Sequence, residues 1–587
     1  MLTKGLKLTA MYAFDVYNEI HVHQDRAVVY LTTSWTTSVP YDMNGQPILQ
    51  RIYEGSNVLS YKQETSGNKK TYLEASLNYD RTFNDDHRVS ALFLFNQQSK
   101  LLYPKGTLED AIPYRMMGIA GRATYSWKDR YFAEFNIGYN GAENFSPKHR
   151  FGTFPAFGVG WVVSNEKFWQ PLSKAVSFLK IRYTDGKVGN SEVSDRRFMY
   201  LDQMKENGDY GYKFGPNGTK WSGYETVNMA VDLIWEESRK QDLGIDLKLF
   251  NDDLSIVFDL FKERRENILL KREHSIPSFL GYNTSAPYGN IGIIENKGFD
   301  GTIEYNKRIN KDWVIALRGN VTFNKDKWIQ GELPEQKYEW MNQYGHNING
   351  VKGYVAEGLF TQAEIDDMAR WESLSDANKA ITPKPFASQF GTVKAGDIKY
   401  KDLNNDGQID AYDQTYISRG DVPTTVYGFG FTVGWKDLSV GMMFHGRSRS
   451  RTCLNGSSVN PFNGGGGSGN LYSNIGDRWT EENPDQNAFY PRLSYGSETT
   501  SNINNFQKST WWVRNMNFLR LKTLQISYNL PKPWVNKVHL KNAAVYVMGT
   551  NLFTLSRFKL WDPELNTDNG ASYPNTTSYS VGINFTF

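Results

Sequence analysis

The sequence predicts an all-β protein, an antiparallel transmembrane β-barrel, and three observations lead to this prediction. Many segments carry apolar residues at every second position, the period of a strand with one apolar face. Short polar turns alternate with long loops between these segments. The final segment keeps the alternation up to Phe587, the last residue. Outer-membrane barrels combine these features, with apolar faces toward lipid and polar faces toward the lumen.

Composition limits the alternatives. A soluble chain of 587 residues would form three or four domains, and a large barrel is the main exception. Hydrophobic residues make up 39% and no apolar run approaches the length of a transmembrane helix. Aromatic content of 14% suits the aromatic girdles of a barrel or a sugar-binding surface. A net charge of +3 implies no nucleic-acid partner, and the single cysteine, Cys453, excludes a disulfide framework.

The clearest β-hairpin is predicted at 242–262. Its first arm places Leu243, Ile245, Leu247 and Leu249 on one face, and its second arm places Leu254, Ile256, Phe258 and Leu260 there. The polar residues 251–253 supply the turn between the arms. Arms of about nine residues match a tilted strand that crosses a bilayer core.

The same pattern recurs along the chain and predicts roughly 14–16 strands. Strands are expected from residue 5, around 73–79, 91–95, 123–127, 133–139, 177–190, 301–305, 313–323 and 424–446, and near 516–530, 541–553 and 578–587. Long loops are expected at about 191–226, 325–423 and 447–510, the last containing GGGGSG at 464–469. The spacing of Thr361 and Glu364 predicts a capped helix over 362–371. Short turns on one side and long loops on the other are typical of outer-membrane barrels.

Several segments resemble the SusC/RagA family of TonB-linked (TonB-dependent) outer-membrane transporters. They include the strand, loop and FP…GW…EKF elements of RYFAEFNIGYNGAENFSPKHRFGTFPAFGVGWVVSNEKFW, followed in family order by SFLKIRYTDGKVGN, NIGIIENKGFDGTIEY, GYVAEGLFTQAEI, AGDIKYKDLNNDGQIDAYDQ, VYGFGFTVGWKDLSVGMMFHG, NFLRLKTLQISYNLP and NLFTLSRFKLWDPELN. The C-terminal strand with its final aromatic also resembles the signal that the outer-membrane assembly machinery recognises. The resemblance covers essentially the whole chain.

The resemblance implies a plugged 22-stranded barrel in the outer membrane of a Bacteroidota-type cell. It implies import of glycans or peptides with a SusD-like surface lipoprotein, energised by the inner-membrane TonB complex. The sequence has no signal peptide, TonB-contacting segment or plug before its first strand, which begins near residue 5. We therefore expect residues 1–587 to be one barrel domain, the C-terminal part of a transporter.

One ion-site motif is present, and it matches an EF-hand loop. Oxygen-bearing side chains fall at loop positions 1, 3, 5, 9 and 12, Gly407 occupies the turn, and Gln408 offers its backbone carbonyl. An aspartate stands where EF-hands use a bidentate glutamate, and no long helix flanks the loop. We expect one structural Ca²⁺, against the alternative of an ion-free polar turn. The expected ligands are Asp402, Asn404, Asp406, Gln408, Asp410 and Asp413.

Aromatic residues in the long loops are the candidates for ligand contact, since a flat ring stacks well on a sugar. Packing within the loops is the alternative for each of them. The candidates are Tyr210, Tyr212, Trp221, Tyr224, Trp340 and Tyr344. Neither a nucleophile elbow nor a zinc-protease motif is apparent, and we expect no enzymatic activity. The sequence therefore favours the barrel portion of a SusC-like importer; a passive porin and a secreted calcium-dependent glycan-binding protein remain alternatives.

Overall fold

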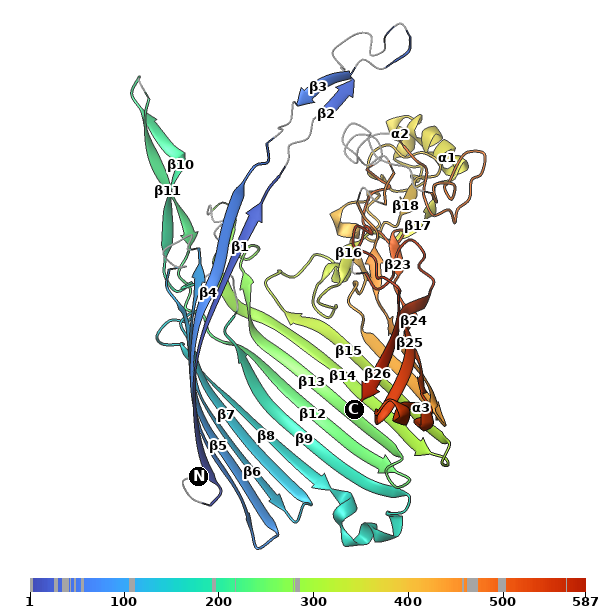
Figure 1. Cartoon of the computed structure of the whole chain (residues 1–587). Coiled ribbons are helices and arrows are strands. Elements are labelled where there is room, and N and C mark those ends of the chain that lie inside the picture. The colour runs from blue at the N-terminus through green and yellow to red at the C-terminus, as the bar shows by residue number, and fades with distance from the viewer. Residues whose placement is uncertain are drawn as a thin grey trace.

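The computed structural model describes residues 4–587 except 26–29, 34–41, 43, 47–48, 54–57, 105–110, 193–196, 217, 278, 280–285, 457–458, 462–472, 495–502 and 566. A single curved sheet makes up most of the molecule, and loops project from one end of it (Figure 1). Among the described residues, no helix is both long and apolar enough to cross a membrane.

Sixteen strands of the described chain form one antiparallel sheet, in which each strand is bonded to the next one along the list below. β1 and β26 are its edges. The strands are β1 (Leu6–His23), β4 (Lys62–Phe83), β5 (His87–Tyr103), β6 (Tyr114–Trp127), β7 (Tyr131–Ala142), β8 (Phe151–Val162), β9 (Val176–Asn190), β12 (Glu236–Leu249), β13 (Leu254–Lys271), β14 (Tyr288–Arg308), β15 (Trp313–Gln330), β20 (Thr425–Trp435), β21 (Leu438–Ser448), β24 (Phe518–Asn529), β25 (Asn542–Ser556) and β26 (Ser578–Thr586).

The connections between strands alternate between short and long. At one end of the sheet, tight hairpin turns join neighbouring strands. Residues with positive φ lie in these turns, among them Asn84, Lys128, Asn251 and Lys436. Asparagine and aspartate tolerate this left-handed conformation better than most residues. The opposite end carries the long connections (Figure 1). The predicted asymmetry of turns and loops is confirmed, and we call the two ends the short-turn end and the long-loop end.

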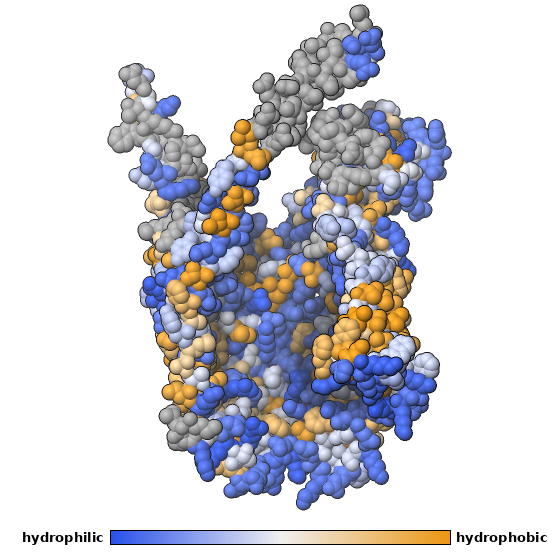
Figure 2. All heavy atoms as spheres, in the orientation of Figure 1, coloured by the Kyte–Doolittle hydropathy of each residue, from blue (hydrophilic) through white to orange (hydrophobic). Residues whose placement is uncertain are grey.

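The strand registers decide which face each side chain occupies. Leu243 lies opposite Leu260, and Leu260 lies opposite Phe299, so these apolar residues share one face. The residues that alternate with them point to the opposite face of the sheet, which carries polar side chains such as Asp242, Asp259 and Asp300. The hollow of the sheet is lined mainly by hydrophilic residues, whereas hydrophobic residues gather on the outward surface of the last strands (Figure 2). Apolar residues therefore face outward, as a membrane-spanning barrel requires.

The long loops contain further elements. Two-stranded sheets are formed by β2 (Tyr30–Thr33) with β3 (Leu49–Tyr53), β10 (Gln203–Phe214) with β11 (Thr219–Asn228), β16 (Val351–Gly353) with β19 (Thr415–Ser418), β17 (Ala356–Leu359) with β18 (Ile398–Tyr400), and β22 (Arg451–Cys453) with β23 (Val513–Asn515). The helices are α1 (Gln362–Glu372), α2 (Asp376–Lys379), α3 (Lys532–Lys537) and the 3₁₀ segments η1 (Val163–Asn165), η2 (Lys167–Leu172), η4 (Glu339–Met341) and η5 (Ala411–Asp413).

The predicted strands and the predicted helix are confirmed, and the structure adds short strands where none is predicted, namely β2, β3, β16, β17, β18, β19, β22 and β23. Two longer elements also differ from the prediction. The segment predicted as the loop 191–226 contains most of the β10–β11 hairpin, because its frequent glycines and polar residues obscure the alternation. The alternation does not by itself predict β8, which the sequence indicates only through the family resemblance, since its outward Phe157, Val159 and Trp161 alternate with small residues and not with polar ones. The GGGGSG segment lies outside the described residues.

Candidate functional site

The inner wall of the sheet is built from charged side chains of neighbouring strands. The Arg182 guanidinium on β9 lies 3.1 Å from Asp242 Oδ1 and 3.5 Å from Asp246 Oδ1, both on β12. Its other nitrogen lies 2.5 Å from Asp259 Oδ1 on β13. Gly244 lies opposite Arg182, and a Cβ at Gly244 would come within 2.3 Å of the Arg182 Cζ atom. Glycine therefore leaves room for this cation to reach three carboxylates.

Arg182 also lines an open hollow of about 700 Å³ on this wall. At its surface, Arg122 Nη2 on β6 donates to Glu134 Oε2 on the neighbouring strand β7 at 3.0 Å. Basic groups outnumber acidic ones on this part of the wall, which includes Arg88, Arg122, Glu134, Lys180, Arg182 and Lys240. The inner face of the sheet is therefore a polar, charged surface that faces the lumen.

The connections β15–β20 and β21–β24 fold together into one compact body, which we call the loop unit (331–424 and 449–517). Its core is dry, and Phe558 from the β25–β26 connection joins it. The buried members are Tyr354, Leu359, Ala395, Ile398, Tyr400, Ile409, Leu454, Val459, Trp479, Ala488, Tyr490, Trp512, Met516 and Phe558. Segments about a hundred residues apart in sequence thus share one core. The loop unit is therefore a folded structure with its own hydrophobic core at the long-loop end.

A buried ion pair ties the two halves of the loop unit together. Arg492 donates from Nε and Nη2 to the two oxygens of Asp397, each at 3.0 Å. Asp397 is 1% exposed. Asn505 donates to Asp397 Oδ1 at 2.9 Å and accepts from the backbone N–H of Ile398 at 2.8 Å. Two-point contact between a guanidinium and a carboxylate fixes orientation as well as distance.

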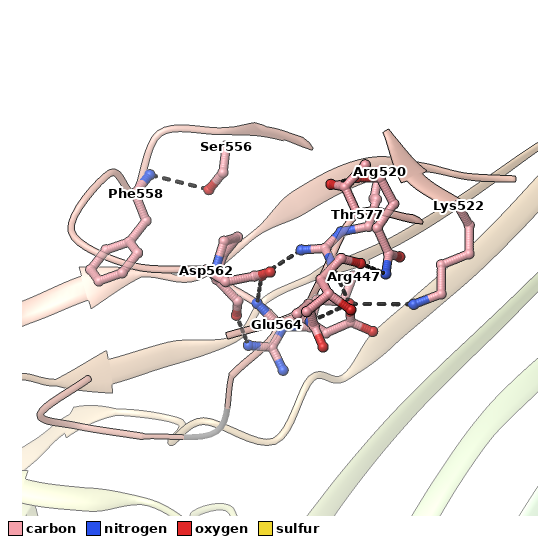
Figure 3. A network of polar contacts seen from close by, with 12 residues as sticks. Arg447, Arg520, Lys522, Ser556, Phe558, Asp562, Glu564 and Thr577 are labelled. Atoms are coloured by element: carbon pink, nitrogen blue, oxygen red, sulfur yellow. Dashed lines mark hydrogen bonds and ion pairs between the residues drawn. The ribbon is translucent and has the colours of Figure 1, made fainter. Parts of the chain in front are cut away.

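A second polar network anchors the β25–β26 connection to the sheet (Figure 3). Arg520 on β24 is 1% exposed and pairs with Asp562, and its Nη1 lies 3.0 Å from Glu564 Oε2. Lys522 lies 3.6 Å from Glu564, and Arg447 on β21 donates to the Pro563 carbonyl. Three cations therefore hold one acidic loop over the last strands.

Known proteins with a similar sequence or fold are TonB-linked receptors and transporters. No family model matches the chain. TonB-dependent receptor P3 of Formosa agariphila is 25% identical over 501 residues, which is 80% of this chain and 45% of the relative. TonB-dependent receptor SusC of Bacteroides thetaiotaomicron is 23% identical over 481 residues, 80% of this chain and 43% of the relative. The RagAB peptide transporter structure superposes with a TM-score of 0.71 at 20% identity, covering 100% of this chain and 60% of that one.

The chain is similar to TonB-dependent receptors, SusC among them, over most of its length, and its fold is that of the RagAB transporter barrel. It spans about half the length of the curated relatives it matches. The fold is that of an outer-membrane β-barrel, a class in which short turns lie on the periplasmic side and long loops on the extracellular side.

The EF-hand-like segment of the receptor, which we call the aspartate loop (402–413), adopts the predicted turn. Gly407 has a φ of +82° and donates its N–H to Asp402 Oδ2 at 2.8 Å. Asp413 is fully buried, and its two oxygens accept backbone N–H groups of Leu403 and Asp410 at 2.7 and 2.9 Å. Burial raises the pKa of the Asp413 carboxyl.

The predicted cation ligands are only partly gathered. Asp402 Oδ1 is buried without a hydrogen-bond partner. Asp406 Oδ1 and Asp410 Oδ1 accept nearby backbone N–H groups of Gln408 and Tyr412, and Asn404 Nδ2 donates to Asp406 Oδ2. Within the described residues, no three acidic, histidine or cysteine side chains form a ready-made metal cluster.

The predicted ligand-contacting aromatics fall into two groups. Four belong to the β10–β11 hairpin, where Tyr212 lies opposite Trp221. Tyr212 and Tyr224 are each 70% exposed, and the side chains of Tyr210 and Trp221 lie outside the described part. The other two pack within the β15–β20 connection. Figure 1 shows the hairpin and the loop unit on different sides of the barrel mouth.

Both aromatics of the second group make internal hydrogen bonds. Trp340 Nε1 donates to the Tyr412 carbonyl at 2.8 Å, which attaches it to the aspartate loop. Tyr344 donates its hydroxyl to the Leu333 carbonyl at 2.6 Å. These two side chains contribute to the structure of the loop unit, and ligand contact by the six aromatic residues stays a prediction.

Sequence reasoning missed the charged groups that organise the site: Arg182 with its aspartates, Asp397 with Arg492, and Arg520 with Asp562. The alternation does place Asp242 and Asp246 on the polar face of their strand. The partner of each, however, depends on strand register or on the folding of distant loops. No local signal in the sequence carries that information.

Proposed function

We propose that this chain is the barrel portion of an outer-membrane nutrient importer that draws energy from the inner-membrane TonB complex. One observation carries the proposal. TonB-dependent receptors align with 80–88% of the chain, over a sheet whose apolar residues face outward and whose polar residues face a lumen. The outward apolar rows argue against a secreted glycan-binding protein, because such a protein would bury them.

Import of glycans or peptides with a SusD-like surface lipoprotein is the specific form of the proposal. A platform with its own dry core at the extracellular end can serve as a docking surface for such a lipoprotein. Exposed Tyr212 and Tyr224 offer flat faces to sugars or to peptide side chains. The RagAB structure is described as a peptide transporter, which makes peptides a substrate class to test beside oligosaccharides.

Uptake in the native cell tests the proposal. Cells that carry the receptor should accumulate a labelled oligosaccharide or peptide mixture, and loss of the receptor or of TonB should abolish uptake of the same component. The lipoprotein should co-purify with the receptor in mild detergent. Uptake that persists without TonB would favour the passive porin.

We also propose one structural Ca²⁺ in the aspartate loop. Asp402, Asn404, Asp406, Asp410 and Asp413 and the Gln408 carbonyl would hold it. The buried, unpartnered Asp402 Oδ1 and the turn at Gly407 support the proposal. A bound Ca²⁺ would neutralise the negative charge of the aspartates. The carboxylates of Asp406 and Asp410 would then coordinate the cation in place of the backbone N–H groups from which they now accept hydrogen bonds.

Calorimetric titration of the receptor with Ca²⁺ tests this site. D402N/D406N should remove the binding signal and shorten the protease half-life of the loop unit. D376N, which alters an acidic residue at the start of α2 in the same unit, is the matched control and should change neither. Unchanged thermal stability and unchanged loop proteolysis after chelation would count against the site.

A further inference from the structure

Three lysines lie side by side on the outer face of the barrel, one on each of three neighbouring strands. Lys262 on β13 lies directly opposite Lys297 on β14, and Lys297 lies directly opposite Lys325 on β15. Adjacent strands are about 5 Å apart. Like charges in directly opposite positions destabilise a sheet, so a row of three requires compensation.

The protein compensates only one end of this row. Lys262 Nζ lies 3.4 Å from Glu295, which also faces Lys327 at 3.5 Å. In the described part of the chain, neither Lys297 nor Lys325 makes an ion pair within 4 Å. We call residues that lie directly opposite one another on neighbouring strands a rung. One rung farther out, by contrast, Arg264, Glu295 and Lys327 alternate in sign. The rung of Lys262, Lys297 and Lys325 therefore carries positive charge that no acidic side chain of the described chain neutralises at Lys297 and Lys325, and an external anion could neutralise it.

Further cations extend the row into the loop unit. The Arg449 guanidinium lies over the Phe323 ring, 5.2 Å from its centroid, which places it beside Lys325 on the outer face. A cavity of about 510 Å³ opens there, and no acidic residue lines it. Its basic lining residues are Lys325, His346, Arg419, Arg449 and Arg451. We call Lys262, Lys297, Lys325, Arg419, Arg449 and Arg451 the basic shelf.

The basic shelf lies directly above the apolar surface of the barrel. Leu260, Phe299 and Phe323 form the next rung toward the membrane, in the same register as the three lysines. The Phe299 ring centroid lies 5.6 Å from that of Phe323 and 5.8 Å from that of Phe258. A molecule that contacts both the aromatic rung and the lysine rung must offer hydrocarbon to the aromatic side chains and negative charge to the lysines.

We propose that the basic shelf binds the phosphate of a phosphorylated glycolipid in the outer leaflet. Acyl chains would lie on the aromatic rung, and the phosphate would bridge Lys297, Lys325 and Arg449. Guanidinium and ammonium groups are the side chains that bind phosphate best, and Arg does so with two parallel donors. Clustered cations next to a membrane surface favour anionic lipids. The inference rests on the outer-membrane location and not on the import activity.

Native mass spectrometry of the receptor, purified from its outer membrane in mild detergent, tests the proposal. The probes are phosphorylated lipid A, the same lipid after enzymatic dephosphorylation, and inorganic phosphate. The wild-type receptor should prefer phosphorylated over dephosphorylated lipid A at least tenfold. K297Q/K325Q/R449Q should bind phosphorylated lipid A at least tenfold more weakly and lose this preference.

K174Q/K311Q/K436Q removes three cations at the short-turn end and should bind the lipid as the wild type does. Heat-modified migration on gels identifies folded barrels, and R449Q alone, with an intermediate loss, replaces the triple variant if that variant does not fold. Equal binding by the wild type and the folded shelf variant would overturn the proposal. Equal binding of dephosphorylated lipid A, or displacement of lipid A by inorganic phosphate at equal concentration, would overturn it too.

Discussion

The barrel wall and the loop unit follow opposite rules for the same kinds of side chain. In the wall, leucine, isoleucine and phenylalanine face outward and charged groups face the interior, as with Leu243 beside Asp242. In the loop unit, apolar side chains such as Ile398 and Trp512 are buried in a common core. Hydrophobic side chains go wherever water is absent, which is outside the wall and inside the loop unit.

The barrel wall and the loop unit therefore owe their stability to different interactions. The wall is held by strand-to-strand hydrogen bonds that lipid leaves without competition. The loop unit stands in water, and its stability depends on a packed core and on a few buried polar contacts. Substitutions in one region should therefore leave the stability of the other unchanged.

Removing one partner of the buried ion pair should have the largest effect, and only on the loop unit. R492A leaves the Asp397 carboxylate buried without its two-point partner, at a cost of about 3–5 kcal/mol. Limited proteolysis should cut the loop unit of R492A much faster, with barrel migration on gels unchanged. R370A, which removes an exposed arginine paired with Asp367, should cost less than about 1 kcal/mol. Equal protease half-lives for the two variants would contradict the assignment.

A charge on the outward face should destabilise the wall and not the loop unit. I256R places a cation against acyl chains, and this costs about 2–4 kcal/mol near the bilayer midplane. V257R, one residue along the same strand, points into the wet interior and serves as the control. Denaturant unfolding in lipid vesicles measures both. A larger loss for V257R than for I256R would reverse the direction assigned to the two faces.

Loss of the α1 cap should loosen the loop unit slightly. Thr361 accepts from the Glu364 N–H, and the Glu364 carboxylate accepts from the Thr361 N–H. T361A should cost about 0.5–2 kcal/mol, seen as faster proteolysis near α1. S375A alters the cap position of α2, where the side chain makes no capping hydrogen bond, and should have no effect. Proteolysis of T361A at the wild-type rate would show that α1 does not depend on its cap.

The smallest expected effect is a pH dependence of the loop unit near His346. Burial, and then the nearby Lys352, lower the pKa of His346 below its usual 6.5. The folded state therefore binds the proton less readily than the unfolded state, and the stabilising contribution is present above pH 6.5. It should be lost as pH falls through the lowered pKa, and H346Q should flatten the dependence. Proteolysis at pH 5 and pH 7.5 measures it, and an unchanged slope in H346Q would assign the dependence to another group.

The sequence alone determined the all-β class, the approximate number of strands in the main sheet, the short turns and the capped helix, because each depends on local periodicity or on neighbouring residues. It also located the aspartate loop and the resemblance to the transporter family. Tertiary structure alone decided the rest. Arg182 meets Asp242 and Asp259, and three lysines share one rung, only through strand register, while Asp397 meets Arg492 only because two long loops fold together. Contacts between distant residues depend on how the whole chain closes, and no local pattern encodes that closure.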